Sequence, residues 1–137
     1  MKKMLSDIFG LNKTFNQINI KKEVIEKICD LSRDSHPKEF LCFFEGYIGK
    51  NVVITDLIFQ PYIADERSAL PRLDIPLTTN IIGSVHSHPG PSNRPSKADR
   101  QFFKKTGIVH AIINKPYTPN DIQFYDIDGE PIEIMIV

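Results

Sequence analysis

The sequence lacks the features that mark several specialised classes of protein. It has only two cysteines among 137 residues, and its 17 basic and 17 acidic side chains leave no net charge. A dedicated nucleic-acid binder needs a strongly basic surface, so the charge balance argues against nucleic acid as the partner. Hydrophobic residues make up 41% of the chain and charged residues 25%, which is typical of a folded domain.

Long apolar runs are absent as well. No segment approaches the roughly 20 consecutive apolar residues that cross a bilayer, and residues 1–10 contain no apolar core of a signal peptide. Cys29 and Cys42 form no C-x-x-C pair, and we expect both to be reduced and buried. These absences favour a cytoplasmic protein that acts without a membrane partner.

The apolar pattern predicts one domain over residues 20–137, preceded by a mostly polar lead-in over residues 1–19. A helix is expected where apolar residues recur at helical spacing, at Ile20, Val24, Ile25, Ile28 and Leu31. Pro37 disfavours a helical residue before it, so this helix should end near Ser35.

Strands are expected at six apolar runs, over residues 40–44, 51–60, 79–85, 108–114, 122–127 and 132–137. Gly46 and Gly49 suit a hairpin connection between the first two runs, and residues 96–105 suit a second helix. Residues 61–76 predict a long surface loop, and loops of this length are often functional. The fold class is therefore α/β, with a central mixed sheet of about six strands flanked by helices.

The segment from His86 to Asp99 carries the clearest chemical pattern. His86 and His88 end an apolar strand two residues apart, so both imidazoles point to one face. Asp99 falls in the first turn of the next helix, after a proline-rich loop that turns the chain round. Because a catalytic zinc ion usually takes three protein ligands and leaves one position to water, we predict zinc at His86, His88 and Asp99.

Each part of this pattern also has a simpler explanation. Two nearby histidines can be structural, and Ser96 with Asp99 forms a capping box at a helix start. Their combination favours a metal site. His110 lies inside a strand, where a lone histidine is more often packed or hydrogen-bonded than metal-bound, and we do not expect His36 to touch zinc.

The same segment resembles the JAMM (MPN+) metalloprotease motif, which is H-S/T-H-P, six residues, then S-x-x-D. His86-Ser87-His88-Pro89, Ser96 and Asp99 match it with the usual spacing, and the resemblance covers most of residues 20–137. It implies a fold like that of the cytidine deaminases, one zinc ion per chain, and isopeptidase or peptidase activity. Deamination is not expected, because His88 stands where H-x-E has its glutamate and P-C-x-x-C is missing.

A zinc-activated water needs a base to take its proton, and two upstream glutamates are candidates. The family places its glutamate seven residues before a glycine, the interval that separates Glu39 from Gly46. We therefore predict Glu39 as the base and a solvated Glu45. By the same resemblance, Ser96 helps to stabilise the oxyanion, a role compatible with capping the helix.

The resemblance also implies the substrate, an amide bond after the Gly-Gly tail of ubiquitin or a ubiquitin-like modifier. The chain has no additional Cys and His residues for a second, structural zinc, which favours small ubiquitin-like or sulfur-carrier proteins as partners. Two alternatives stay open: a processing peptidase for a sulfur-carrier protein, and a metal-free MPN scaffold. The intact His86, His88, Asp99 and Glu39 argue against the scaffold.

Overall fold

A computed structural model describes residues 17–59 and 80–137. In chain order these residues form β1 (Ile18–Ile20), α2 (Lys22–Ser35), β2 (Leu41–Ile48), β3 (Val52–Ile58), β4 (Ile81–His88), α3 (Lys97–Phe103), β5 (Val109–Asn114), a 3₁₀ turn (Pro119–Asp121), β6 (Ile122–Tyr125), β7 (Pro131–Ile132) and β8 (Met135–Ile136). Residues 1–16 of the predicted lead-in over residues 1–19, and the whole predicted loop over residues 61–76, lie outside the described residues.

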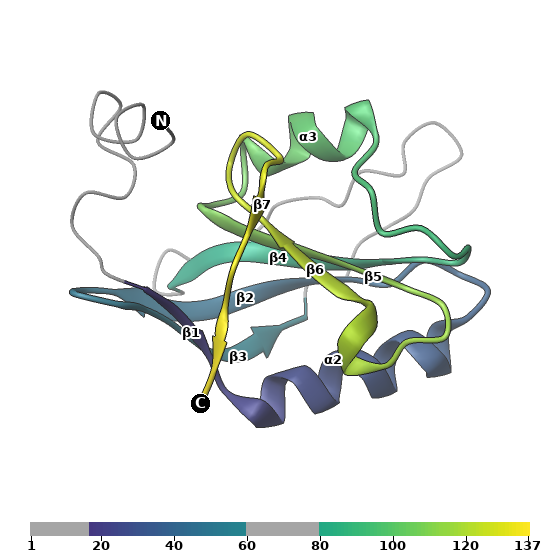
Figure 1. Cartoon of the computed structure of the whole chain (residues 1–137), viewed down its shortest axis with the longest axis horizontal. Coiled ribbons are helices and arrows are strands. Elements are labelled where there is room, and N and C mark those ends of the chain that lie inside the picture. The colour runs from purple at the N-terminus through teal and green to yellow at the C-terminus, as the bar shows by residue number, and fades with distance from the viewer. Residues whose placement is uncertain (1–16, 60–79) are drawn as a thin grey trace.

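The strands form one curled, mixed sheet in the order β7-β6-β5-β4-β2-β3-β1-β8. β4 lies near its middle, antiparallel to β2 and parallel to β5. Helix α3 covers one face of the sheet and helix α2 covers the other (Figure 1). The predicted α/β class with a central mixed sheet is confirmed, and the described part of the chain has eight strands in place of about six.

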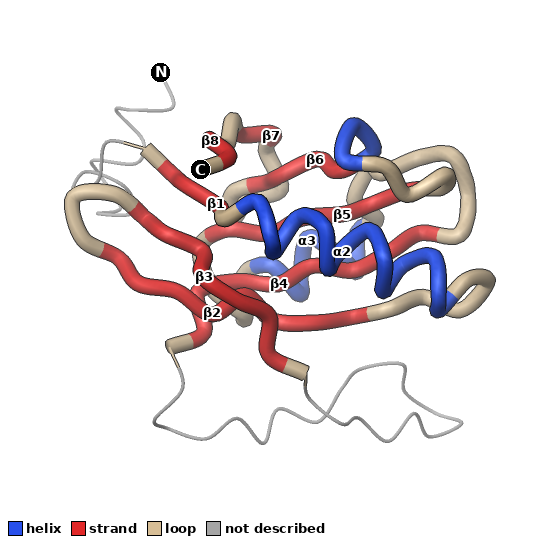
Figure 2. The backbone as a smooth tube through the Cα atoms, turned by 90° about the horizontal axis from the view of Figure 1, so that it is seen from below, coloured by secondary structure: helices blue, strands red, loops and turns tan. Residues whose placement is uncertain are grey.

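The additional strands come from the two ends of the described chain. The run predicted as one strand over residues 132–137 divides between β7 and β8, which pair with β6 and β1, respectively. β7 and β8 are the first and last strands in the order of the sheet, and they lie close together in Figure 2 because the sheet curls. Ile20, predicted to begin the helix, ends strand β1 instead, and α2 begins at Lys22. The predicted boundary between residues 19 and 20 thus runs through a strand of the sheet.

Gly46 was expected in a turn but lies inside strand β2. Only Gly49 occupies the connection to β3. The pairing register of β2 shifts between Glu45 and Gly46, and a Cβ on Gly46 would collide with the carbonyl of Val53. This glycine therefore allows a close approach of two strands at a bulge.

The main core lies between the sheet and helix α2. The helix ends at Ser35, as Pro37 predicted, and it buries the apolar residues Val24, Ile25, Ile28 and Cys29. Cys29 and Cys42 are free and buried, as expected, and burial raises the pKa of the Cys42 thiol to about 12. Both thiols are thus small core residues at neutral pH. Of the helices described, none combines the length and the apolar composition that a bilayer crossing requires.

The core on the α3 face is much smaller. Phe103, Ile112 and Tyr125 form its buried apolar cluster, with Phe102 packed at its side. Polar side chains share this face, because His86 and His110 are buried next to Phe103. Among residues 17–59 and 80–137, the face with the smaller apolar cluster is thus the one that carries the predicted chemistry.

Candidate metal centre

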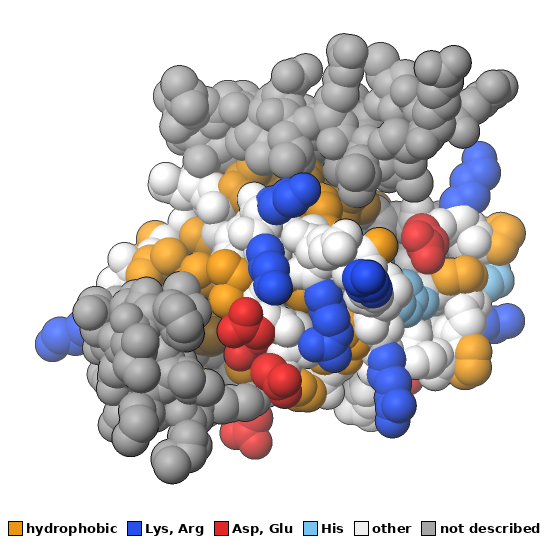
Figure 3. All heavy atoms as spheres, turned by 90° about the horizontal axis from the view of Figure 1, so that it is seen from above, with side chains coloured by type: hydrophobic (Ala, Val, Ile, Leu, Met, Phe, Trp, Pro, Cys, Tyr) orange, Lys and Arg blue, Asp and Glu red, His pale blue; other side chains and the backbone are white. Residues whose placement is uncertain are grey.

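Strand β4 presents His86 and His88 side by side at its end. Because β4 is paired on both sides, to β2 and to β5, the backbone that carries the two histidines is held from two directions. Their Nε2 atoms lie 3.2 Å apart, and their side chains are 10% and 19% exposed. Figure 3 shows histidine side chains reaching the surface on the α3 face, near lysine and arginine side chains. Both side chains are therefore mostly buried but keep some exposed surface.

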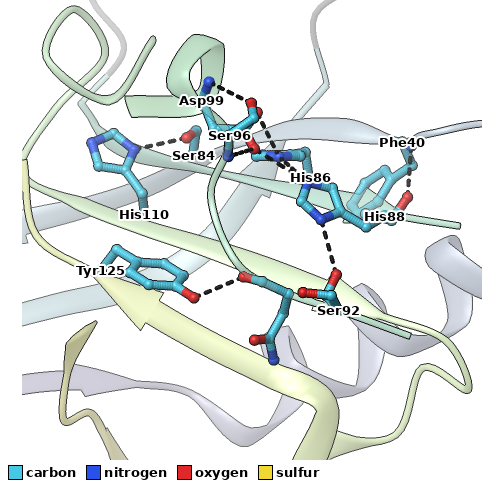
Figure 4. Close-up of polar contacts among 11 residues, drawn as sticks. Phe40, Ser84, His86, His88, Ser92, Ser96, Asp99, His110 and Tyr125 are labelled. Atoms are coloured by element: carbon cyan, nitrogen blue, oxygen red, sulfur yellow. Dashed lines mark hydrogen bonds and ion pairs between the residues drawn. The ribbon is translucent and has the colours of Figure 1, made fainter. Parts of the chain in front are cut away.

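The ring of His88 is oriented by a backbone carbonyl. Its Nδ1 lies 3.0 Å from the carbonyl oxygen of Ser92 (Figure 4). A carbonyl can only accept, so Nδ1 carries a proton, and in the neutral ring the lone pair is therefore on Nε2. Several hydrogen bonds hold the surrounding loop. Among them, Asn114 Nδ2 donates to the Pro91 carbonyl at 3.1 Å, and Tyr125 Oη donates to the Asn93 carbonyl at 2.7 Å. The loop thus selects the tautomer of His88 that can bind a metal.

Asp99 faces both histidines from the first turn of α3. Its Oδ1 lies 3.2 Å from Nε2 of His86, and its Oδ2 lies 3.2 Å from Nε2 of His88. Oδ2 also accepts from the Ser96 backbone N–H at 2.8 Å, while Ser96 Oγ accepts from the Asp99 N–H at 3.0 Å. The capping box is present, and it positions the same carboxylate that faces the histidines. The two explanations of S-x-x-D are therefore compatible.

The electrostatics of the cluster favour an ionised Asp99 carboxylate, which is the form that binds a metal. Burial by itself raises the pKa of Asp99, but hydrogen bonds from His86 and His88, the charge of His86 and the Ser96 N–H together hold it well below its usual range. The hydrogen bond to Asp99 raises the pKa of His88 against the opposing effect of burial. In the metal-free protein a proton on His88 therefore pairs with Asp99, and a metal ion must compete with that proton.

The geometry suits a small, tetrahedral cation. One ligand atom from each of His86, His88 and Asp99 can be chosen so that all lie within 4.8 Å of one another. Zinc–ligand bonds of about 2.1 Å in a tetrahedron separate neighbouring ligand atoms by about 3.4 Å. The two Nε2 atoms lie 3.2 Å apart, and each lies 3.2 Å from a different carboxylate oxygen of Asp99. Two imidazoles and one carboxylate are a common donor set for catalytic zinc. The residues present fit the ion.

Glu39 lies next to the cluster and Glu45 does not. Leu41 pairs with His86, and the Ser87 N–H donates to the Phe40 carbonyl, so the register brings Glu39 opposite His88 on the same face. The charge of Glu39 also contributes to the raised pKa of His88. Glu45 pairs with Ile81, six residues further along β2, which is roughly 20 Å of strand. Of the two candidates, only Glu39 is near enough to serve the site.

The other polar residues near the site have structural partners. Ser87 Oγ accepts from the Phe40 N–H at 2.8 Å and ties the start of β2 to β4. His36 Nδ1 lies 2.8 Å from Tyr117 Oη, which donates to the backbone carbonyl of His88 at 3.4 Å. His110 bonds to Ser84 at 2.7 Å, in agreement with the expectation that it is packed and hydrogen-bonded. The Ser92 carbonyl was missed, because a backbone contact leaves no signature in residue type.

Comparisons with known proteins identify the family that this chain resembles. The family described as prokaryotic homologues of the JAB domain matches residues 21–128. A protein of Haloferax volcanii named a probable metalloprotease is 34% identical over 122 residues, which cover 82% of this chain and 75% of that protein. Among solved structures, a JAB1/MPN domain protein from Archaeoglobus fulgidus is 30% identical with a TM-score of 0.70, covering 89% of this chain and 98% of that one.

A second solved structure, described as a JAMM metalloprotease-like zinc site in the proteasome and signalosome, is also 30% identical, with a TM-score of 0.70. The match covers 89% of this chain and 99% of that one. A protein from Desulfitobacterium hafniense, 19% identical with a TM-score of 0.59, shares the fold over 88% of this chain and 93% of its own.

Proposed function

Because the chain belongs to the JAB (JAMM/MPN) family, we propose that it is a zinc-dependent isopeptidase or peptidase that cleaves the amide bond after the Gly-Gly tail of a ubiquitin-like modifier. One observation carries the proposal: the Nε2 atoms of His86 and His88 and the carboxylate of Asp99 converge with separations of 3.2 Å. Zinc bound there supplies Lewis-acid activation of a water molecule and of the amide carbonyl.

The chain's own residues handle the protons of the reaction. In this mechanism Glu39, opposite His88, takes a proton from the attacking water and passes it to the leaving amine. Glu39 lies two residues before β2 and is exposed, so a substrate could reach it there. No covalent bond between protein and substrate is required.

Ser96 has a second task at the start of α3. Its Oγ accepts from the Asp99 N–H, which leaves the hydroxyl proton available to donate to the developing oxyanion. One such donor contributes about 3 kcal/mol to a transition state of this kind. Capping and catalysis thus use different parts of one hydroxyl group.

The test compares two substrates with and without metal. A ubiquitin-fold protein that ends in Gly-Gly is joined either to the α-amine of a following peptide or to the ε-amine of a lysine. We expect the purified protein to contain one zinc per chain and to cleave after Gly-Gly. Cleavage should stop with 1,10-phenanthroline and return with zinc.

The relative rates on the two substrates distinguish the isopeptidase from the processing peptidase. Faster cleavage of the lysine-linked substrate supports an isopeptidase, and cleavage of the linear fusion alone supports the processing peptidase. A protein that binds no zinc in elemental analysis would refute the proposal and restore the scaffold alternative. Cleavage that survives the chelator would also refute it.

A further inference from the structure

Below the metal centre lies a second polar pair, Ser84 and His110, which the proposed mechanism does not use. Both residues are 0% exposed, and Ser84 Oγ lies 2.7 Å from His110 Nδ1. Ser84 precedes His86 by two residues in β4, so it lies on the same face of the sheet (Figure 4). The parallel register of β4 and β5 places His110 directly beside it.

The hydrogen bonds of His110 have a definite direction. Its Nε2 lies 3.1 Å from the carbonyl oxygen of Gly107, which can only accept, so Nε2 carries the proton. Burial lowers the pKa of His110 to about 4, so the ring is neutral at pH 7 and Nδ1 accepts from the Ser84 hydroxyl. A glycine is required at residue 107, since its φ is +127° and a Cβ would collide with the Ile82 carbonyl.

These two bonds join His110 to different parts of the chain. Ser84 belongs to β4, the strand that carries His86 and His88, whereas Gly107 belongs to the connection that leaves helix α3. The ring of Phe103, at the end of α3, stacks on His110 with centroids 4.4 Å apart and planes 9° apart. Phe103 also contacts His86, with ring centroids 6.5 Å apart.

An apolar residue would fill this space without needing partners, whereas a buried polar pair is costly unless every group is bonded. The presence of a hydrogen-bonded pair here, in place of apolar side chains, therefore needs a reason other than filling the space. Helix α3 has only seven residues, and it must hold Asp99 within 3.2 Å of both histidines. A His110 ring that is held in place by hydrogen bonds fixes Phe103, and Phe103 in turn fixes the end of α3.

We infer that Ser84 and His110 are positioning residues that fix helix α3, and with it Asp99, against the two histidines of the metal centre. The inference rests on the proposed function only in taking zinc as the ion bound there. It concerns ligand geometry, so it can be measured without any substrate.

The test uses Ser84→Ala, which removes the hydroxyl, and Ser84→Thr, which retains it. A second variant, His110→Phe, keeps a ring under Phe103 but removes both hydrogen bonds. Zinc affinity is measured by competition with a chromophoric chelator, and ligand geometry by the visible absorption of the cobalt-substituted protein. Ile28→Val, in the core on the opposite face, controls for a general loss of stability.

We expect Ser84→Ala and His110→Phe to keep their circular dichroism spectra and to bind zinc about tenfold more weakly, as when an outer partner of a metal ligand is lost. Their cobalt spectra should change, and Ser84→Thr should restore both properties. The inference is overturned if Ser84→Ala binds zinc and cobalt like the wild type. It is also overturned if Ile28→Val, at an equal loss of melting temperature, weakens zinc binding as much. A wild-type protein that binds no zinc would instead contradict the proposed function.

Discussion

The two faces of the central sheet are built from different residues. On the α2 face, apolar side chains from the helix and from most of the strands form one continuous core. On the α3 face, the apolar cluster has three buried members in the described part of the chain, Phe103, Ile112 and Tyr125, and it packs beside buried polar groups. One face contributes mainly burial of apolar surface, while the other uses burial to fix polar groups in place.

This difference suggests that stability and chemistry are separable in this protein. Substitutions on the α2 face should change the free energy of unfolding and leave metal binding alone. Substitutions on the α3 face should change metal binding or catalysis at a smaller cost in stability. Five variants test this separation, beginning with the largest expected effect.

His86→Ala removes a predicted ligand from the α3 face. We expect zinc affinity to collapse and cleavage to become undetectable, because two protein ligands cannot hold the ion as three do. The fold should persist, because the α2 core is untouched. Elemental analysis, cleavage assays and circular dichroism check the three statements, and a variant that retains zinc and activity would contradict the assignment.

Glu39→Gln separates catalysis from metal binding. Loss of a general base lowers rates by about 10²- to 10⁴-fold, and zinc should remain at one ion per chain. Glu45→Gln is the matched control, since Glu45 pairs with Ile81 at the other end of β2. Its kcat/KM should equal that of the wild type. A fully active Glu39→Gln enzyme would show that another group takes the proton.

Ser96→Gly separates the two tasks of one hydroxyl group. A glycine N-cap costs only a few tenths of a kcal/mol relative to serine, so stability should hardly change. The oxyanion donor is lost, and we expect kcat to fall by about 10²-fold or more. Ser96→Thr keeps the hydroxyl and should keep most of the activity. Unchanged kcat in Ser96→Gly would leave Ser96 as a helix cap alone.

His110 makes the stability of the metal-free protein depend on pH. Its pKa is about 4 in the folded protein, below the ordinary 6.5, so the unfolded chain binds the proton more readily. Stability due to this residue is therefore complete above pH 6.5 and is lost as the pH falls towards 4, by roughly 3 kcal/mol. Urea unfolding with a chelator present should show a flatter pH profile for His110→Phe. Parallel profiles would contradict this.

Ile113→Val has the smallest expected effect and tests the other side of the comparison. Ile113 lies in the same strand as His110 but faces the α2 core, where it is 0% exposed. Removing one methylene group should cost about 1 kcal/mol of unfolding free energy. Zinc affinity and kcat/KM should stay at the wild-type values. A loss of zinc affinity here would show that the two faces are coupled.

The sequence alone located the site because the interactions that build it are local. His86 and His88 share a face through the two-residue period of a strand, and Ser96 and Asp99 are joined by a capping box within one helical turn. The same local logic predicted the end of α2 before Pro37. The position of Asp99 next to the β4 histidines depends in addition on how α3 packs on the sheet.

Long-range pairing explains what the sequence did not reveal. The division of residues 132–137 into β7 and β8 depends on two sheet ends that are distant in sequence. Ser84 and His110 are 26 residues apart in the sequence, and they meet because of the pairing register between β4 and β5. Glu39 was chosen over Glu45 by resemblance to a family, and it is the pairing of β2 with β4 that places it opposite His88.

Through β7 and β8, the C-terminal segment pairs with two different strands of the sheet, β6 and β1. Two residues, Glu133 and Ile134, separate strands that lie at opposite margins of the sheet. Deleting the segment after Glu130 would leave β6 and β1 each paired on one side only, and unpaired strand margins recruit other chains. A short piece of chain thus replaces two longer edge strands with edge strands of two residues each, which offer fewer unpaired backbone groups to another chain.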